Sequence, residues 1–172
     1  MIEGMTNILV GGEPVQTVGS LPAAGSKLPA FTIADPELRD IDSSAFAGKT
    51  VVLNIFPSLD TDVCSMSVRK FNAIAQHLDN AVVVCVSEDL PFAQGRFCGA
   101  EGIRNVKVGS AFRSSFGKDF GVTMIDGPLK GLLSRSVVVA NPDGVVTYTE
   151  QVPDVHNEPD YDAARKAVEG AR

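Results

Sequence analysis

The stretch that decides the fold is residues 54–71, which read NIFPSLDTDVCSMSVRKF. An apolar strand predicted over 51–56 leads into a Pro-Ser turn, and Thr61 and Asp62 then form a typical helix start. Cys64 falls in the first turn of that helix. Because helix N-termini present unpaired N–H groups and the positive end of the helix dipole, this position favours the thiolate form of a cysteine.

The residues after the cysteine predict which face of the helix packs on the sheet. Apolar positions follow at intervals of 4, 3, 4 and 3 residues: Cys64, Val68, Phe71, Ala75 and Leu78. Residues at these intervals share one face of an α-helix. We therefore predict a helix over 62–78 with Cys64 on its buried face, covered rather than open to solvent.

The rest of the chain predicts the order β-α-β-α-β, then a β-hairpin and a last helix. The predicted strands are 6–10, 15–18, 31–34, 50–56, 81–87, 105–108, 122–125, 136–140 and 145–149. The other predicted helices are one turn within 42–49, 89–102 and 159–170, with a partly helical segment over 111–120. This order describes an α/β, thioredoxin-like fold with a central mixed sheet flanked by helices. An added N-terminal β-hairpin covers 1–18, and we expect one domain over 1–172.

Composition limits the classes of partner. The 172 residues carry a net charge of −6 and a pI near 4.8, without a basic stripe. Nucleic acid and anionic membranes are therefore not expected as partners. No apolar stretch has the length of a membrane span, and Met1–Gly4 lacks the positive region of a signal peptide. We expect a cytoplasmic protein.

The cysteines indicate reactive or buried thiols rather than a disulfide scaffold or a metal site. There are three, Cys64, Cys85 and Cys98, and no C-x-x-C motif. His77 and His156 have no metal-ligand spacing with them, so neither zinc nor another cofactor is expected.

The context of each cysteine suggests a different role. Cys85 lies inside the apolar run 82–86, where it reads as a small hydrophobe of the core. Cys98 neighbours Gln94 and Gly102 at four residues on either side, off a core stripe formed by Leu90, Ala93 and Phe97. Cys98 is therefore expected to be reachable, and the pattern leaves open whether it is functional.

Thr61 and Pro57, which both precede Cys64, each have two possible roles. Thr61 is either an ordinary N-cap or a hydroxyl that hydrogen-bonds the thiolate or an oxygen beside it. Pro57 either shapes the turn or covers the sulfur from water. The pattern does not separate these roles.

The spacing Pro57-x-x-x-Thr61-x-x-Cys64 resembles the active-site signature of peroxiredoxins. Further segments resemble the bacterial thiol peroxidase branch of that family and extend over essentially the whole chain. They are 54–61 (NIFPSLDT), 67–72 (SVRKFN), 89–94 (DLPFAQ), 96–98 (RFC), 126–132 (DGPLKGL), Arg135 and 158–161 (EPDY).

The resemblance implies a role for five residues. Cys64 corresponds to the peroxidatic cysteine and Cys98 to the resolving cysteine, which implies an intrachain Cys64–Cys98 disulfide. Pro57, Thr61 and Arg135 correspond to the rest of the peroxide-activating site. Arg135 would be missed from pattern alone, because an isolated arginine at a strand end is more often solvated. The family is generally homodimeric.

Two other positions carry implications of their own. Cys85 matches a strand cysteine that turnover in relatives does not require. Asp62 stands where relatives often carry a small residue, so it either disfavours the thiolate or matches the helix dipole as a first-turn anion.

The implied activity is a thiol peroxidase that acts on hydrogen peroxide and organic hydroperoxides in antioxidant defence. A thiolate attacks the peroxide, and the sulfenic acid formed on Cys64 condenses with Cys98. Thioredoxin then reduces the disulfide. Because Cys64 starts on the buried face, we expect the first helical turn to unwind before the sulfurs meet.

Three alternatives to this activity remain. They are a thioredoxin-type thiol–disulfide oxidoreductase, a cysteine hydrolase that would use His77 or His156, and a module in which Cys64 is inert.

Overall fold

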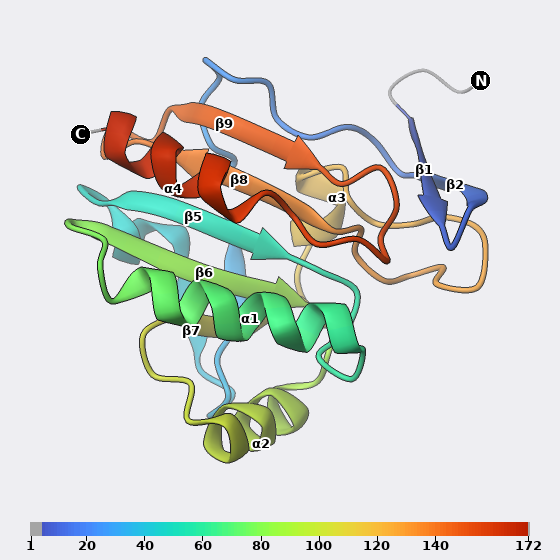
Figure 1. Cartoon of the computed structure of the whole chain (residues 1–172), viewed down its shortest axis with the longest axis horizontal. Helices are drawn as coiled ribbons and strands as arrows, with labels where there is room; N and C mark the ends of the chain where they lie inside the picture. Colours follow the sequence, from blue (N-terminus) through green and yellow to red (C-terminus); the bar gives the residue numbers. More distant parts are fainter. Residues whose placement is uncertain (1–4, 172) are drawn as a thin grey trace.

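A seven-stranded mixed sheet forms the centre of this computed structural model, which describes residues 5–171 (Figure 1). The strand order is β4-β3-β7-β6-β5-β8-β9. The strands are β3 (Thr32–Ala34), β4 (Asp40–Asp42), β5 (Thr50–Ile55), β6 (Ala81–Ser87), β7 (Lys107–Ser110), β8 (Ser136–Ala140) and β9 (Val146–Gln151). Strand β5 pairs in parallel with β6 and antiparallel with β8. All six residues of β5 are buried, as expected for an apolar strand covered on both faces.

Helices cover both faces of the sheet. One face packs against α1 (Asp62–Ala75) and α4 (Tyr161–Gly170), with residues of α2 (Pro91–Glu101) at its border. The opposite face packs against the short η1 (Ser43–Phe46) and α3 (Phe116–Asp119). Figure 1 shows α1 and α4 side by side in front of the sheet and α3 behind it. The predicted layering is confirmed.

The N-terminal hairpin is a separate two-stranded sheet of β1 (Thr6–Val10) and β2 (Glu13–Thr17). Gly11 and Gly12 form its turn with φ of +58° and +88°, which glycine adopts without steric cost. Residues 1–4 lie outside the described residues. They begin the predicted extension 1–18 and are the segment that was expected to lack the features of a signal peptide.

The hairpin docks on the segment that follows β9. Leu9 exchanges backbone hydrogen bonds with this segment, to Pro153 O at 2.8 Å and from Val155 N at 3.0 Å. The Asp154 carboxylate accepts from the backbone N–H groups of Gly11 and Gly12. The hairpin therefore fixes the chain around Val155.

Several predicted boundaries were wrong, and each has a local cause. Helix α1 ends at Ala75 rather than at residue 78. The backbone N–H groups of His77 and Leu78 donate to the carbonyl oxygens of Ile74 and Ala75, three residues earlier, which forms a tighter turn. Helix α2 begins at Pro91 rather than at residue 89, with proline in the first turn. Helix α4 begins at Tyr161, after Asp160 caps it through the N–H of Ala163.

Several predicted strands shift by one or two residues at an end, and two differences have a clear local cause. Strand β7 covers Lys107–Ser110 rather than 105–108, because the N–H of Asn105 donates to the Asn72 side chain instead of to a neighbouring strand. Segment 122–125 is not a strand and makes only isolated bridges, Thr17 to Met124 and Thr123 to Leu133.

Over residues 5–171, no helix is both long and apolar enough to cross a bilayer.

Candidate active site

The junction between β5 and α1 buries the sulfur of Cys64. Cys64 and Val68 are fully buried and Phe71 is 1% exposed, so the predicted apolar face of α1 is confirmed. Ala75 and Leu78 pack partly buried against the same cluster. The thiol therefore lies under the first turn of α1 and not on the surface.

Arg135 reaches this sulfur from a distant part of the chain. It directly precedes β8, whose Ser136 pairs with Ile55 at the end of β5, so the sheet brings it beside the β5–α1 junction. Its side chain is only 1% exposed. Its Nη2 donates to Cys64 Sγ at 3.1 Å and its Nε donates to Val155 O at 2.8 Å. The structure therefore places a buried positive charge and a hydrogen-bond donor directly beside the sulfur.

The third nitrogen of the guanidinium makes no such contact. Nη1 of Arg135 is buried and has no hydrogen-bond partner among the described residues. Arg135 lines a cavity of about 200 Å³ together with Pro57, Thr61, Asp62, Val63, Leu129, Val155 and His156. A buried donor without a partner is costly, so Nη1 is suited to bind an oxygen that enters this cavity.

Thr61 and Pro57 form the side of the cavity next to the helix start. The Thr61 hydroxyl donates to Ser58 O at 3.0 Å and makes no capping bond to any residue that the structure describes. Thr61 therefore occupies the N-cap position of α1, as the sequence allowed, but its side chain does not cap the helix. Its oxygen retains lone pairs that can accept from an O–H group in the cavity. Pro57 is buried and lines the same cavity, in line with a covering role.

The opposite side of the cavity comes from segments that sequence reasoning did not assign to the site. His156 was interpreted as solvated; it is exposed, yet it lines the cavity with Val155 and Leu129. Leu129 lies in segment 126–132, whose resemblance to the family was the available signal. Nothing in the sequence around Val155 and His156 indicated their place, which depends on the hairpin docked there.

Asp62 and Glu158 set the charge around the guanidinium. Asp62 is an exposed acid in the first turn of α1 and also lines the cavity. The pKa of Glu158 is lowered, first by its hydrogen bond with Lys70 and also by the charge of Arg135. Lys70 Nζ lies 3.0 Å from Glu158 Oε1. The cation of Arg135 therefore has an anion in its surroundings as well as the sulfur beside it.

Cys98 is less open than predicted. It is a half-buried free thiol that packs against the same cluster as Cys64, and burial raises its pKa. The expected core stripe of α2 was wrong at Leu90, whereas Phe97 packs against the core as expected. Leu90 is 51% exposed, whereas Gln94 is fully buried, and Cys98 lies one turn after Gln94.

Cys85 is a core residue, as predicted. It is fully buried in β6 and accepts a hydrogen bond from Asn54 Nδ2 at 3.6 Å. Burial raises the pKa of this thiol to about 12. At neutral pH Cys85 therefore stays a protonated thiol.

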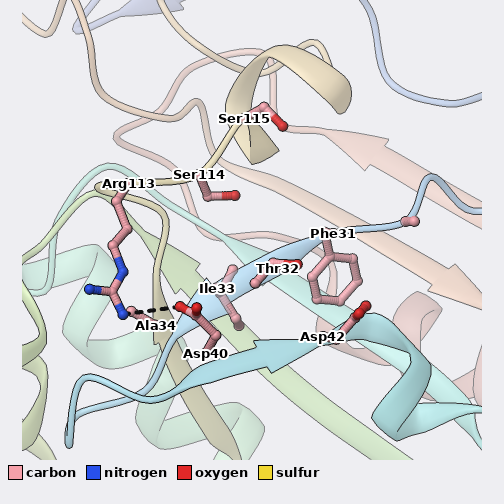
Figure 2. A pocket seen from close by; sticks show the side chains of 10 residues that line it. Phe31, Thr32, Ile33, Ala34, Asp40, Asp42, Arg113, Ser114 and Ser115 are labelled. Atoms are coloured by element: carbon pink, nitrogen blue, oxygen red, sulfur yellow. Dashed lines mark hydrogen bonds and ion pairs between the residues drawn. The ribbon is translucent and has the colours of Figure 1, made fainter.

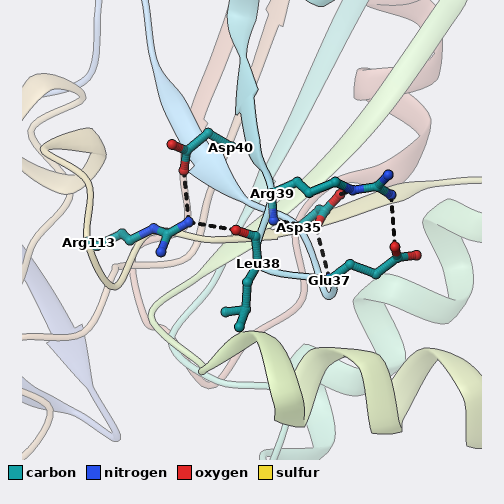
Figure 3. Close-up of polar contacts among 6 residues, drawn as sticks. All are labelled: Asp35, Glu37, Leu38, Arg39, Asp40 and Arg113. Carbon is teal, nitrogen blue, oxygen red and sulfur yellow. Dashed lines mark hydrogen bonds and ion pairs between the residues drawn. The ribbon is translucent and has the colours of Figure 1, made fainter.

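A larger cavity elsewhere lacks a nucleophilic thiol and an unpartnered cation. It measures about 470 Å³ and lies between β3, β4 and the segment before α3, with no cysteine in its lining (Figure 2). Its Arg113 donates to Asp40 at 3.0 Å and to Leu38 O at 2.8 Å, so the guanidinium is already bound to the β3–β4 turn (Figure 3). Over residues 5–171 no cluster of three or more His, Cys, Asp or Glu side chains could hold a metal.

The chain is similar to known proteins over most of its length. The Redoxin family matches residues 23–164. Thiol peroxidase of Mycobacterium tuberculosis is 56% identical over 95% of this chain and 99% of its own length. Thiol peroxidase of Corynebacterium glutamicum is 53% identical over 91% of this chain and 95% of its own.

A solved structure supports the fold. A peroxiredoxin-like protein of Aquifex aeolicus superposes with a TM-score of 0.93 at 35% identity, over 98% of this chain and 99% of that one. The predicted α/β, thioredoxin-like fold with an N-terminal hairpin is therefore confirmed.

Proposed function

Because this chain belongs to the Redoxin family and is a thiol peroxidase, a peroxiredoxin enzyme, we propose that it reduces hydroperoxides through Cys64 as the peroxidatic thiol. The observation that carries this assignment is the Arg135 guanidinium. It donates to Cys64 Sγ at 3.1 Å from one nitrogen, leaves another buried nitrogen without a partner, and belongs to a residue that lines the adjoining cavity.

In the first step the Cys64 thiolate attacks one oxygen of the hydroperoxide. A sulfur–oxygen bond forms, the oxygen–oxygen bond breaks, and the second oxygen leaves as hydroxide or alkoxide and takes up a proton. Arg135 Nη1 stabilises the negative charge that develops on the oxygens, while the Thr61 oxygen accepts from the peroxide O–H. Pro57 limits the access of water. The product is a sulfenic acid on Cys64 and water or an alcohol.

In the second step the Cys98 thiol condenses with the sulfenic acid. The Cys64–Cys98 disulfide forms and one water leaves, so the two thiols together supply the two electrons that reduce the peroxide. Cys64 is fully buried under the first turn of α1. That turn therefore unwinds before the sulfurs meet. Thioredoxin then reduces the disulfide by thiol–disulfide exchange.

The cavity supports both hydrogen peroxide and organic hydroperoxides as substrates. About 200 Å³ is more than hydrogen peroxide requires, and Val63, Leu129 and Val155 provide apolar contacts for an organic group. Such activity would serve antioxidant defence.

The competing function is that of a thioredoxin-type thiol–disulfide oxidoreductase. The absence of C-x-x-C from the sequence and the burial of Cys64 count against it. Reduction of insulin by the reduced protein without peroxide would favour this alternative.

The decisive experiment is peroxide consumption coupled to thioredoxin, with each cysteine replaced in turn. We expect Cys64→Ser to lose all activity, and Cys98→Ser to lose thioredoxin-supported turnover while it keeps one oxidation per chain. We expect Cys85→Ser to remain active. A folded but inactive Cys85→Ser protein would overturn this assignment of the thiols.

The wider organisation is proposed on the resemblance to the family. The chain forms one domain over 1–172, assembles as a homodimer and acts in the cytoplasm without a cofactor. Analytical ultracentrifugation of the reduced protein tests the dimer.

A further inference from the structure

The Asp89 carboxylate lies where β6 leads into α2 and holds the turn before the peroxidatic helix. Its Oδ1 accepts from the Ser58 hydroxyl at 2.7 Å. Its Oδ2 accepts from the Leu59 N–H and from the Ser87 hydroxyl, both at 2.7 Å. Hydrogen bonds to a carboxylate are about twice as strong as those between neutral groups, so this side chain ties 58–59 firmly to the end of β6.

The same network continues into the helix that carries Cys98. The Ser87 hydroxyl accepts from Gln94 Nε2 at 3.1 Å, and Gln94 Nε2 also donates to Gly109 O at 3.0 Å. Gln94 is fully buried and precedes Cys98 by four residues, on the same face of α2. The polar side chains between the two cysteine-bearing segments therefore form one continuous chain: Ser58, Asp89, Ser87 and Gln94.

A second link between these segments is much weaker. Arg96 on α2 lies 3.9 Å from Asp60, and both side chains are more than 70% exposed. Exposed pairs of this kind contribute little. The Asp89 network is therefore the main polar connection between the turn and α2 that the structure describes.

We propose that Asp89 is a positioning residue for both halves of the catalytic cycle, an inference that rests on the proposed peroxidase function. With the network intact, the turn 57–61 holds Pro57 and Thr61 against the cavity and the site can react with peroxide. Release of Ser58 and Leu59 from Asp89 frees the start of α1 to unwind and lets Cys64 approach Cys98. The network thus favours oxidation of Cys64 and opposes formation of the disulfide.

The first test measures the network without any catalysis. In Asp89→Ala, amide hydrogen exchange over 58–66 of the reduced protein should accelerate by ~10-fold or more, because hydrogen bonds to a charged group are lost. Ser58→Ala removes one of the three bonds to Asp89, and also the bond that the Ser58 hydroxyl accepts from the Asp60 N–H at 3.1 Å. Outside residue 60 it should therefore give a smaller acceleration, so it serves if Asp89→Ala does not fold.

Asp35→Ala is the matched control. Asp35 is also a carboxylate with several donors, from the N–H groups of Glu37 and Arg39 and from Arg39 Nε, but these bonds stay within the β3–β4 turn (Figure 3). This turn packs near α2, since a Cβ on Gly95 would lie 3.3 Å from Pro36. Asp35→Ala therefore controls for general loosening beside α2 and should leave exchange over 58–66 unchanged.

The second test separates the two chemical steps by rapid quench with mass spectrometry. Hydrogen peroxide is added to reduced protein, and sulfenic acid and disulfide are quantified over time. We expect Asp89→Ala to slow sulfenic acid formation by ~10-fold and to speed the later formation of the Cys64–Cys98 disulfide. A purely structural role would slow both steps or neither.

Equal slowing of both steps, or unchanged exchange over 58–66 in Asp89→Ala, would overturn the proposal. Failure of the proposed function gives a different result. A wild-type protein that forms no sulfenic acid is no peroxidase, yet its exchange data still show whether Asp89 holds the turn.

Discussion

The Arg135→Lys substitution tests the arrangement on which the active site depends. It keeps the positive charge but removes the planar fork, which contacts Val155 O through Nε and Cys64 Sγ through Nη2. The third nitrogen, Nη1, is buried without a partner and is proposed to bind the peroxide. The single nitrogen of lysine cannot occupy these three positions together. The variant therefore separates geometry from charge.

The expected loss follows from the hydrogen bonds at stake. Each hydrogen bond that involves a charged group contributes about 1.5–3 kcal/mol. Loss of one of them in the transition state costs about 2 kcal/mol, which corresponds to a rate lower by ~30-fold. Loss of two, to the sulfur and to the peroxide oxygen, gives a rate lower by ~1000-fold. We expect Arg135→Lys to fall between these limits.

The assay is a single oxidation of Cys64 in a Cys98→Ser background, with the sulfenic acid trapped and quantified by mass spectrometry. Arg113→Lys is the control, because Arg113 is a half-exposed arginine bound to Asp40. It should leave the oxidation rate unchanged. Oxidation of Arg135→Lys at the wild-type rate would refute the reasoning, because the fork would then contribute nothing to the transition state.

Three further predictions concern other positions. On alkylation of the native protein at neutral pH, half-buried Cys98 should react slowly and Cys85 not at all, because burial raises the pKa of both thiols and that of Cys85 to about 12. Rapid labelling of Cys85 would contradict this. Burial raises the pKa of half-buried Glu88 from 4.5 to about 7, so the folded state holds the proton more tightly and the free energy of unfolding should fall as pH rises from 4.5 to 7. After allowance for its exposure the fall is about 1 kcal/mol, and urea unfolding at several pH values should show it in the wild type but not in Glu88→Gln. Leu129→Ala removes apolar contact worth about 1 kcal/mol to a bound organic group. It should therefore lower kcat/KM for cumene hydroperoxide ~5-fold and change kcat/KM for hydrogen peroxide little. Equal losses for the two substrates would argue against an organic group beside Leu129.

The sequence was sufficient where the structure is determined locally. The apolar run of β5, the turn after it and the spacing from Cys64 to Phe71 lie within one continuous segment. Their burial follows from the period of the helix and the cover on both faces of the strand. The β5–α1 unit and the burial of Cys64 were therefore predictable without any relative.

The partners of Cys64 were not predictable in this way. Arg135 is separated from Cys64 by 71 residues, and their contact depends on the pairing of β5 with β8. The residues next to Arg135 in the sequence do not indicate that pairing, so only the resemblance to the family identified Arg135 as a partner of Cys64. Val155 and His156 depend on the docking of the hairpin, a contact between the two ends of the chain.

Helix α2 shows a different limit. Its expected apolar stripe assigned Leu90 to the core and Gln94 to the surface, and the structure reverses both. Gln94 is buried because Ser87 and Gly109 O satisfy its amide N–H groups, which no hydrophobic pattern can reveal. The same error made Cys98 look more reachable than it is.

The burial of Arg135 links the chemistry of the first step to the motion needed for the second. With the proposed thiolate on Cys64, the guanidinium has an anion 3.1 Å away and the folded turn contains a matched pair of charges. Conversion to sulfenic acid removes that anion. Loss of a close partner destabilises a buried cation, and Arg135 then keeps the hydrogen bond to Val155 O and the more distant charge of Glu158. On the proposed mechanism, oxidation therefore weakens the folded turn at the moment when Cys64 has to leave it, and reduction of the proposed disulfide restores the charge pair that stabilises the turn.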